Sequence, residues 1–518
     1  MDKSIFWGRI SRYHLLLISI ILLTFGLRMY NVTDRPHDLF FDEVAIGYNA
    51  YSILKTGKDE YGNFLPISFR SFNDYKLPFY IYATSITEAV FGKNAFAVRI
   101  PAIIFGSATV IFFMALVKLL TGSHKQTLLC GLLLAISPWH LQFSRAAFEA
   151  TVALFFIVLG TYLIFLALIA KKSTFFWGLI SLIISIYTYH TPRLIVPLLL
   201  LAIFFLYKKN FWLVVKQKHA LLFLGIILLL SLPLLIYISS PAGWARFQLV
   251  SLFNDYHQKG TQSELAFWGL GRFWENYIAN FSFDFLFFAG DSIGRHSVRE
   301  MGMNYVWQLP FFLIGLFTAV KNKTTTQKFF LAWLIISPIA AALATPNPHA
   351  IRAISPVISI IYFISLGLWM STAYFKHHAK LFLSVISIFL GFFVLLYLHI
   401  YYVHYPQRTA PDWLGGYKQA MEYITAHQQN YDRIAVTDAN PLWYIYVYFY
   451  GPFTPSQILT QKDPQHQIGK FMTVGSPFTP NRGEKTLYVA QPIEKWNGHL
   501  VTIIYDHGED EVFKLWEN

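Results

Sequence analysis

The sequence predicts a polytopic α-helical membrane protein with a small α/β domain at its C-terminal end. The chain of 518 residues is 55% hydrophobic and 13% charged, whereas soluble proteins carry about 25% charged residues. Apolar segments long enough to cross a bilayer recur from the N-terminal region to residue 401. Beyond them, residues 405–518 change to short strand-like runs, turn residues and one helical pattern.

The membrane segments are runs of spanning length with few charges. The first follows Lys3, Arg9 and Arg12 and has no small-residue cleavage site after it, so we expect it to remain as a transmembrane helix rather than act as a removable signal peptide. About eleven such helices are expected, over residues 13–30, 97–119, 127–143, 148–170, 175–190, 192–207, 219–239, 306–320, 328–345, 350–372 and 379–401.

The basic residues predict the orientation of these helices. Alternate short connections and the N-terminus hold 16 of the 41 Lys and Arg residues, with Asp2 as their only acid. Positive loops favour the cytoplasmic side. We therefore expect an integral protein of the plasma membrane, with a cytoplasmic N-terminus and an external or periplasmic C-terminus. The cytoplasmic lysines are Lys118, Lys125, Lys171, Lys172, Lys208, Lys209, Lys216, Lys218, Lys321, Lys323, Lys328, Lys376 and Lys380.

Two loops on the external side, residues 31–94 and 240–305, are too long to be simple connections. In the C-terminal segment, a helix is expected over Trp413 to His427, and strands over 434–437, 487–490 and 500–505. The expected division is a membrane domain of residues 1–404 and an external α/β domain of residues 405–518.

Several function classes are excluded or weakened by what the sequence lacks. Cys130 is the only cysteine, so no disulfide framework or cysteine metal site is expected. The lysines are scattered over short loops, which argues against a nucleic-acid partner. Neither a P-loop nor a Gly-x-Gly-x-x-Gly helix start occurs, so a soluble nucleotide is not expected as the direct donor of a transferred group.

Two adjacent carboxylates, Asp42 and Glu43, follow the first apolar segment. The apolar residues after them recur at helical spacing, which predicts that the pair opens an interfacial amphipathic helix. Carboxylates at a helix N-terminus stay ionised, as a general base requires. An ordinary acidic cap explains these two residues equally well.

Single arginines stand in three short external connections, where the topological bias disfavours them: Arg145, Arg193 and Arg352. Each guanidinium needs an anionic partner, and lipid headgroups, a local carboxylate or a bound phosphate all qualify. Together with Lys76 in the first external loop, the three arginines favour one shared site for the phosphate of a lipid-linked donor.

Weaker candidates surround these residues. Glu149 lies four residues after Arg145 and is either its local ion-pair partner or a second acidic group of the site. The turn from Gly290 contributes further polar residues to the external face, or is simply a glycine-bounded turn. The histidines form no His-Glu-x-x-His zinc pattern. Substrate-binding candidates are Tyr189, His190, Asp291, Arg295, His296 and His349.

With these residues in place, the chain resembles the C-type-fold membrane glycosyltransferases, specifically bacterial relatives of the protein O-mannosyltransferases and the lipid A aminoarabinose transferase. Four features carry the resemblance over residues 13–400: the Asp42-Glu43 pair, the segment from Lys76 to Pro78, the segment from Phe91 to Pro101, and Arg145 with Glu149. Relatives often have Lys-Pro-Pro at Lys76 and an aspartate near Glu149, which leaves the subfamily and the acceptor open.

The resemblance implies a sugar donor carried on a polyprenyl phosphate and a catalytic base at the first acid, Asp42. The expected reaction is attack of an acceptor hydroxyl, on a protein, lipid or glycan, at the anomeric carbon, with inversion of its configuration. Glu43 and Glu149 would support Asp42, and membrane lipids surround the chain. A good leaving phosphate makes a metal unnecessary, although relatives sometimes hold a divalent ion near these acids. The alternatives are a lipid or sugar transporter, or a membrane anchor for the C-terminal domain.

Overall fold

The structure is a computed structural model that describes residues 11–72, 74–215, 220–256, 261–439, 442–475, 478–480, 483–494 and 496–518. The chain divides into two compact units. One combines Met1–Tyr30 with Ala102–Leu398, and the other combines Asn31–Pro101 with His399–Asn518. This division differs from the expected boundary at residue 404, because residues 31–101, which include the first long loop, associate with the C-terminal segment.

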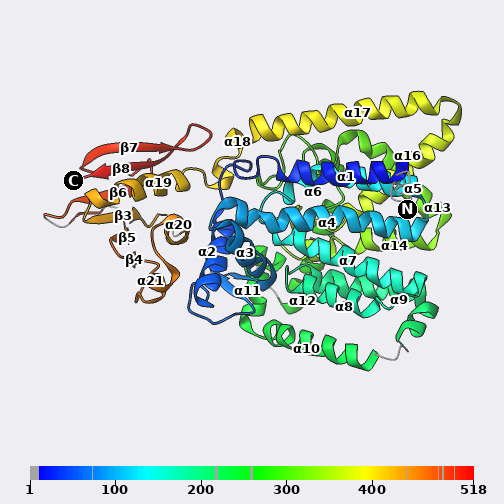
Figure 1. Ribbon diagram of the computed structural model, residues 1–518, viewed down its shortest axis with the longest axis horizontal. Coiled ribbons are helices and arrows are strands. Elements are labelled where there is room, and N and C mark those ends of the chain that lie inside the picture. The colour runs from blue at the N-terminus through cyan, green and yellow to red at the C-terminus, as the bar shows by residue number, and fades with distance from the viewer. Residues whose placement is uncertain are drawn as a thin grey trace, which may run out of the picture. The chain divides into compact units, whose positions relative to one another are not determined.

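The first unit is built almost entirely of helices. Several long ones, among them α1, α7 and α17, run roughly parallel to one another in Figure 1. The main helices are α1 (Arg12–Met29), α4 (Ala95–Thr121), α5 (His124–Ala135), α6 (Pro138–Phe143), α7 (Glu149–Ala170), α8 (Phe175–Ile186), α9 (Pro192–Val215), α10 (Ala220–Ile238), α11 (Pro241–Val250), α12 (Gln262–Ala279), α13 (Leu309–Asn322), α14 (Thr325–Ile336), α15 (Ile339–Ala342), α16 (Val357–Tyr374) and α17 (Ala379–His399).

Each of the eleven apolar segments expected to span contains a helix. Eight helices of the described residues are long and apolar enough to cross a membrane, and Phe175–Ile186 is a shorter apolar helix. The segment 127–143 is divided into α5 and α6 because Ser137 and Pro138 begin a new helix. The number of membrane-spanning helices therefore stays a prediction.

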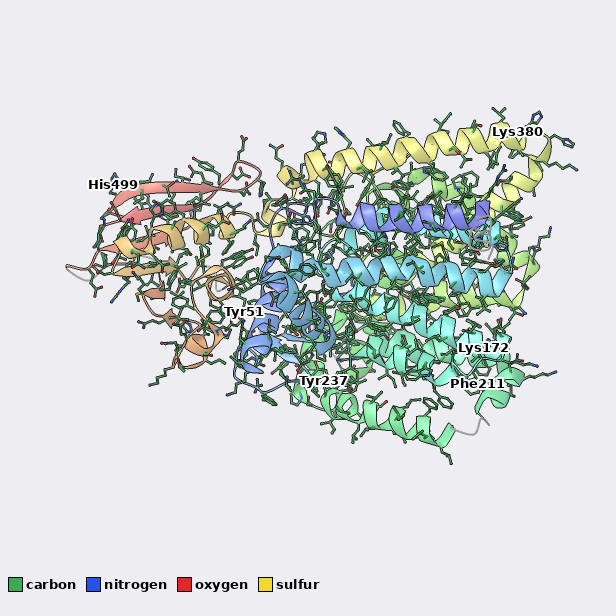
Figure 2. All side chains as sticks on the ribbon, in the orientation of Figure 1. Tyr51, Lys172, Phe211, Tyr237, Lys380 and His499 are labelled. Atoms are coloured by element: carbon green, nitrogen blue, oxygen red, sulfur yellow. The ribbon has the colours of Figure 1, made fainter. Side chains whose placement is uncertain are left out.

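The ends of these helices agree with the expected lysine pattern. Figure 2 shows Lys172 and Lys380 at one end of the helical unit, with Phe211 nearby, while Tyr237 lies toward the opposite end. Tyr237 is near the end of α10, one helix after Phe211 in the chain. Two of the lysine connections, those of Lys172 and Lys380, thus lie at the same end of the helices. Which membrane side that end faces stays a prediction.

The second unit combines two helices from the first external loop with a mixed sheet. The loop contributes α2 (Phe41–Thr56), the hairpin β1 (Phe69–Ser71) and β2 (Asp74–Lys76), and α3 (Pro78–Phe91). The C-terminal part contains α18 (Tyr405–Arg408), α19 (Tyr417–His427), α20 (Trp443–Tyr450), α21 (Pro455–Leu459), β3 (Arg433–Thr437), β4 (Gln467–Ile468), β5 (Phe471–Val474), β6 (Thr486–Ala490), β7 (His499–Tyr505) and β8 (Glu511–Glu517).

The six-stranded sheet has the order β4-β5-β3-β6-β8-β7, with β3 parallel to both β5 and β6. All five residues of β6 are buried, as expected for an apolar strand inside a sheet. The three strands expected from the sequence are present as β3, β6 and β7. The expected helix begins four residues late, at Tyr417, because Gly416 has a φ of 96° and interrupts it.

Candidate active site

The two acidic residues of the first loop open α2. Helix α2 begins at Phe41, and Glu43 is its third residue. The Glu43 carboxylate accepts a hydrogen bond from the backbone N–H of Phe40 at 3.3 Å, which caps the helix start. The acidic-cap reading of the sequence therefore holds for Glu43. It does not account for Asp42, whose side chain points elsewhere.

Asp42 is the accessible member of the pair. Its side chain is 45% exposed and forms an ion pair with Lys76, which is itself only 8% exposed. Lys76 ends β2 and pairs across the hairpin with Phe69, so the ammonium is held by a short sheet. The result is a carboxylate that solvent or a ligand can reach, fixed in position by a buried cation. Lys76 was expected to contact a donor phosphate; here it holds the candidate base.

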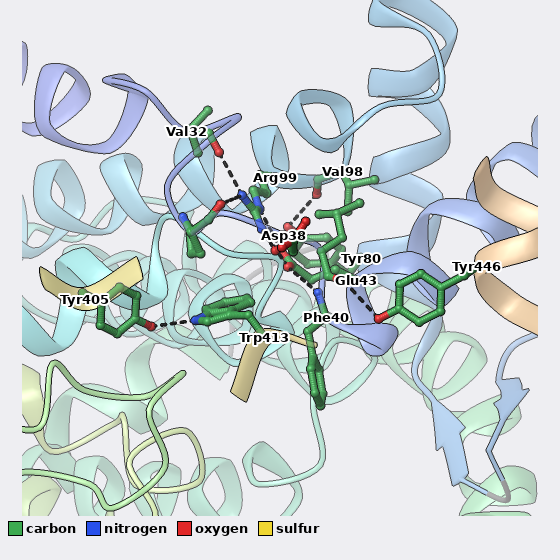
Figure 3. Close-up of polar contacts among 12 residues, drawn as sticks. Val32, Asp38, Phe40, Glu43, Tyr80, Val98, Arg99, Tyr405, Trp413 and Tyr446 are labelled. Carbon is green, nitrogen blue, oxygen red and sulfur yellow. Dashed lines mark hydrogen bonds and ion pairs between the residues drawn. The ribbon is translucent and has the colours of Figure 1, made fainter. Parts of the chain in front are cut away.

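Glu43 has a different environment. It forms a two-point ion pair with Arg99, with Nε to Oε1 and Nη2 to Oε2 both at 3.0 Å (Figure 3). Both side chains are buried. Arg99 also donates to the backbone carbonyls of Val32 at 2.9 Å, and of Pro36 and Asp38 at 2.6 Å. One guanidinium thus holds the segment that leads into α2. This arrangement supports a structural role for Glu43.

The expectation of an interfacial amphipathic helix after Glu43 is wrong. Ten of the sixteen residues of α2 are buried, from Glu43 to Ile53. The helix packs against α3 and α20. At Gly47, an added Cβ would lie 2.6 Å from the ring of Phe449, so the small residue permits close approach of α20. The apolar residues that suggested a membrane-facing stripe are instead covered by the second unit itself.

A cluster that the sequence analysis did not single out lies beside the pair. Asp38 is 4% exposed, and its Oδ2 lies 3.6 Å from Nε2 of His507, on the turn between β7 and β8. The rings of His37 and His507 are in edge contact, with centroids 4.5 Å apart. Burial raises the pKa of Asp38 to about 6, although Lys418 and Arg99 act in the opposite direction. The cluster ties the first loop to the C-terminal hairpin.

Two of the predicted arginines share a cavity in the helical unit. The cavity has a volume of about 510 Å³, and Arg193, Arg246 and Arg352 all line it. Its described lining residues include no carboxylate. The predicted residues Tyr189 and His190 also line it, and its apolar walls are formed by Leu194, Ile238, Trp244, Phe247, Val250, Ala340, Leu343 and Ala344.

The arginines of this cavity differ in how they are held. Arg193 donates from Nη1 to the carbonyl of Gly243 at 3.1 Å and lies over the ring of Tyr237. Its Nε and Nη2 are buried and have no hydrogen-bond partner among the described residues. Arg352 donates to the carbonyls of Thr345 and Pro346 at 2.9 and 3.1 Å. Burial lowers the pKa of Arg352 to about 10, so it remains charged at neutral pH.

Arg145 is not among the residues that line this cavity. Its buried guanidinium donates to three backbone carbonyls at the end of α1, those of Leu27 at 2.5 Å, Arg28 at 3.2 Å and Tyr30 at 2.7 Å. Unpaired carbonyls at a helix C-terminus carry partial negative charge, which a cation stabilises. The structure therefore gives Arg145 a capping role and brings Arg193 and Arg352 to one cavity. Lys76 belongs to the other unit, so a shared phosphate site with the arginines stays a prediction. Glu149 begins α7.

The turn after Gly290 has a defined structure. Asp291 accepts hydrogen bonds from the backbone N–H groups of Ile293 at 2.9 Å and Ala350 at 2.7 Å, and it contacts Nδ1 of His296 at 2.9 Å. His349 lies next to His296, with ring centroids 4.7 Å apart. Burial lowers the pKa of both histidines, well below the usual value for His349. The backbone carbonyl of Arg295, in the same turn, accepts a hydrogen bond from Gln142.

Two further residues were missed in the sequence analysis, Arg246 and Arg99. Arg246 stands in a connection that the sequence predicts to be external, so the topological bias that pointed to the other arginines applied to it equally. Arg99 gave no such signal, because it lies inside α4 and its partner Glu43 is 56 residues away. Only the folded structure brings these two charges together.

Comparisons with known proteins agree with this picture. Residues 76–237 match the family model described as dolichyl-phosphate-mannose-protein mannosyltransferase. An uncharacterized protein of Aquifex aeolicus is 26% identical over 189 residues, which is 36% of this chain and 36% of the relative. The chain thus matches about a third of that relative's length.

Solved structures show the same fold. ArnT from Cupriavidus metallidurans bound to undecaprenyl phosphate matches with a TM-score of 0.56 and 14% identity over 97% of both chains, and its apo state with 0.54 and 12% over the same shares. An Archaeoglobus fulgidus oligosaccharyltransferase with zinc and sulfate has a TM-score of 0.52 and 14% identity over 90% of this chain and 62% of its own. The resemblance to C-type glycosyltransferases that the first-loop motifs indicated is thereby confirmed at the level of fold.

Proposed function

We propose that the protein is a membrane glycosyltransferase that moves a sugar from a polyprenyl-phosphate carrier to an acceptor hydroxyl. The observation that carries the proposal is the cavity of about 510 Å³ with three arginines and apolar walls. The structural match to ArnT bound to undecaprenyl phosphate supports it. The donor is a polyprenyl-phosphate-linked sugar, and the acceptor is a protein, lipid or glycan.

The cavity has the chemistry of a lipid phosphate site. Guanidinium groups bind phosphate oxygens through paired N–H donors, and the apolar walls suit the first isoprene units of the carrier. Arg193 has two buried N–H groups without partners among the described residues. A buried unpaired donor costs about 1–3 kcal/mol, and a bound phosphate oxygen would remove that cost. Binding of an anion would thus provide acceptors for the buried N–H groups of Arg193 that have none among the described residues.

The position of the cavity agrees with an external reaction. Arg193 lies over Tyr237, and Tyr237 is toward the end of the helical unit opposite to Lys172 and Lys380 (Figure 2). If the lysine connections face the cytoplasm, the cavity opens near the external membrane face. We place the N-terminus in the cytoplasm, residues 405–518 outside, and the acceptor on the external side.

Asp42 is our choice for the catalytic base. The acceptor hydroxyl attacks the anomeric carbon on the face opposite the lipid phosphate, whose bond to that carbon breaks, so the configuration inverts. Asp42 takes the hydroxyl proton. Base catalysis of this kind contributes about 10²–10⁴-fold. Asp42 is the half-exposed member of the pair, whereas Glu43 is occupied by Arg99. Lys76 holds the Asp42 carboxylate in place, and the arginines stabilise the departing phosphate.

The donor site is tested by binding of undecaprenyl phosphate to the purified full chain in detergent, measured by native mass spectrometry. Arg193→Gln should weaken binding about 10- to 100-fold, because a hydrogen bond to a charged group is worth about 1.5–3 kcal/mol. The matched control is Arg272→Gln, which removes an exposed arginine paired with Glu275. Equal affinity in Arg193→Gln and wild type would exclude this cavity as the donor site.

The reaction class is tested with the same preparation. Incubation with a polyprenyl-phosphate sugar and membrane extract as the acceptor source should release free polyprenyl phosphate in proportion to the glycosylated product. A protein that moved the lipid across vesicle membranes without releasing its sugar would be a transporter, and the glycosyltransferase proposal would fail.

A further inference from the structure

We propose that Glu60 is a positioning residue that makes the Asp42–Lys76 ion pair respond to pH near neutrality. Glu60 lies between α2 and β1, and it is 5% exposed. It acts on the candidate base through Lys76 and does not itself touch the reacting atoms. The inference rests on the proposed glycosyl transfer, because Asp42 is the base of that reaction.

Glu60 joins the two elements that carry the ion pair. Its Oε1 accepts a hydrogen bond from Nδ2 of Asn49 at 3.2 Å, and its backbone N–H donates to Oδ1 of Asn49 at 3.0 Å. The same Oε1 accepts a hydrogen bond from Oγ of Ser71 at 2.6 Å. Asn49 belongs to α2, which also carries Asp42. Ser71 belongs to β1, which pairs with the strand that ends at Lys76. One carboxylate oxygen thus ties the helix of the base to the hairpin of its cation.

The other oxygen of Glu60 is where the carboxyl group can hold a proton. Oε2 is buried and has no hydrogen-bond partner among the described residues. Because Oε1 already accepts two hydrogen bonds, a proton on the carboxyl group belongs on Oε2. Ionisation would leave Oε2 as a buried anionic oxygen without a partner, which is costly. Burial therefore raises the pKa of Glu60 to about 7, although the hydrogen bonds from Ser71 and Asn49 act in the opposite direction.

The surroundings of Glu60 contain one cation and several groups that do not titrate near pH 7. The cation is Lys76, whose positive charge acts to lower the pKa of Glu60. The other titratable neighbours are Asp59, Tyr61, Tyr48, Tyr444 and Tyr448. Burial raises the pKa of all four tyrosines, so they stay neutral at pH 7. The carboxylate of Asp59 accepts hydrogen bonds from the backbone N–H groups of Tyr61 and Asn63 at 2.9 and 2.8 Å.

A change in the charge of Glu60 changes how tightly Lys76 holds Asp42. Lys76 attracts both carboxylates, that of Asp42 in a direct ion pair and that of Glu60 through its electrostatic field. An ionised Glu60 shares the ammonium charge and weakens its hold on Asp42. Asp42 must loosen this ion pair to accept the proton of an acceptor hydroxyl. Turnover should therefore rise as pH increases through 7.

The test compares kcat for sugar transfer as a function of pH in the purified full chain, at saturating donor. In wild type, kcat should rise about three- to tenfold with a midpoint near pH 7. Glu60→Gln should stay near the low-pH value throughout, with the KM for the donor unchanged. Ser71→Ala removes a hydrogen bond that favours the ionised carboxylate, so it should keep the rise and move its midpoint to higher pH.

Glu88→Gln is the matched control. Glu88 is a buried glutamate of α3, and the charge that acts on it is that of Lys93. This variant should therefore follow the wild-type profile. The inference is overturned if the kcat profiles of wild type and Glu60→Gln coincide, or if Glu88→Gln removes the rise as Glu60→Gln does.

Thermal unfolding of the same variants separates this inference from the proposed function. The pKa of Glu60 in the folded protein lies above the 4.5 of an ordinary glutamate, so the stability that it contributes is complete below pH 4.5 and is lost as pH rises through 7. Glu60→Gln should therefore gain Tm relative to wild type over this interval, whether or not the protein transfers sugar. A constant difference in Tm would overturn the inference. A wild type that transfers no sugar at any pH would contradict the proposed function, and the role of Glu60 in it, even where the Tm difference changes as expected.

Discussion

Two neighbouring carboxylates, Asp42 and Glu43, show how position on one helix turn separates two roles. Successive residues of an α-helix point about 100° apart, so the two side chains meet different surroundings. Glu43 faces inward to Arg99, and Asp42 faces Lys76 with 45% of its side chain exposed. A buried ion pair that loses one partner leaves an uncompensated charge. Substitution of Asp42 should therefore affect turnover, and substitution of Glu43 should affect the stability of the fold.

The first prediction follows from that difference. Asp42→Asn preserves size and removes the base, so it should lower turnover at least about 100-fold with donor binding nearly intact. Glu43→Gln leaves Arg99 buried without its anion, so it should lower the Tm and cost about 3–5 kcal/mol of stability. Turnover with lipid-linked donor and thermal unfolding measure the two effects. Normal turnover in Asp42→Asn together with inactive but stable Glu43→Gln would reverse the assignment.

The second prediction concerns the pH dependence of stability near Asp38. Its pKa in the folded protein is about 6, against 3.8 for an ordinary aspartate, chiefly because of burial. The folded state therefore holds its proton more tightly than the unfolded state does. This favourable contribution is complete below pH 3.8 and is lost as pH rises through 6, which amounts to about 3 kcal/mol at 1.36 kcal/mol per pKa unit.

Asp38→Asn removes this titration and should gain stability relative to wild type between pH 4 and pH 8. Thermal unfolding of both proteins at a series of pH values gives the comparison. The neighbouring charged groups Arg99, Lys418 and Glu422 are present in both proteins, so a difference that changes with pH reports on Asp38 and on its contact with His507. A constant difference in Tm over this range would show that Asp38 does not titrate as the structure indicates.

Sequence reasoning found residues that stand out locally and missed those defined by their partners. Asp42, Arg193 and Arg352 were visible because charge is rare beside apolar segments and against the loop bias. Arg99 and Asp38 depend on contacts between distant segments, and Arg145 turned out to satisfy carbonyls of α1. A single sequence does not reveal such pairings, because hydropathy and periodicity report only on neighbours along the chain.

At the scale of elements, the length of the apolar segments predicted where the helices lie but not how they pack against one another. Each expected membrane segment contains a helix. The character of α2 was misjudged because its apolar residues read equally as a membrane-facing or a buried stripe, and α20 covers them. The aromatic helix α20 was not foreseen. In the sheet, the apolar strands β3, β6 and β7 were recognised, while β4 and β5 were too short and β8 was too polar to stand out.

Two helices of the first unit pack through a pair of glycines, and this contact gives the third prediction. Gly315 of α13 and Gly367 of α16 face each other's helix so closely that an added Cβ would clash with the backbone carbonyls of Phe363 and Phe311. Small residues allow membrane helices to approach in this way. A backbone carbonyl cannot move aside as a flexible side chain can, so α13 and α16 would have to separate to accommodate an added methyl group.

Gly315→Ala should therefore reduce the yield of monodisperse protein and lower its Tm, despite the better helix propensity of alanine. Gly391→Ala in α17 is the matched control, because nothing lies within 4 Å of a Cβ built there. Size-exclusion chromatography and thermal unfolding provide the readouts. Equal yields and equal Tm values for the two variants would contradict the close contact between α13 and α16 at Gly315.

At the scale of the whole molecule, the distribution of charge implies an orientation in the membrane. The terminal and loop cations that define the expected cytoplasmic side comprise 16 of the 41 basic residues, and the other 25 are balanced by 27 acids elsewhere. Within the helical unit, Lys172 and Lys380 lie at the same end, away from Tyr237 and the arginine cavity beside it (Figure 2). If the end of the helical unit that carries Lys172 and Lys380 is cytoplasmic, the arginine cavity lies toward the external side. One measurement of topology therefore tests the orientation of the helical unit and the position of the cavity together.

The last prediction is that Lys172 is cytoplasmic and Lys462, in the C-terminal segment, is external. Both side chains are exposed, and the native Cys130 is buried, so single cysteines can be introduced at 172 and 462 over a low background. An impermeant maleimide should label position 462 in intact cells, or in spheroplasts where an outer membrane blocks access, and should label position 172 only after the membrane is opened. The opened sample controls for accessibility at both positions. Labelling at 172 in sealed cells would invert the topology of the helical unit and place the arginine cavity on the cytoplasmic side. Protection of 462 until the membrane is opened would contradict the external position of the C-terminal segment.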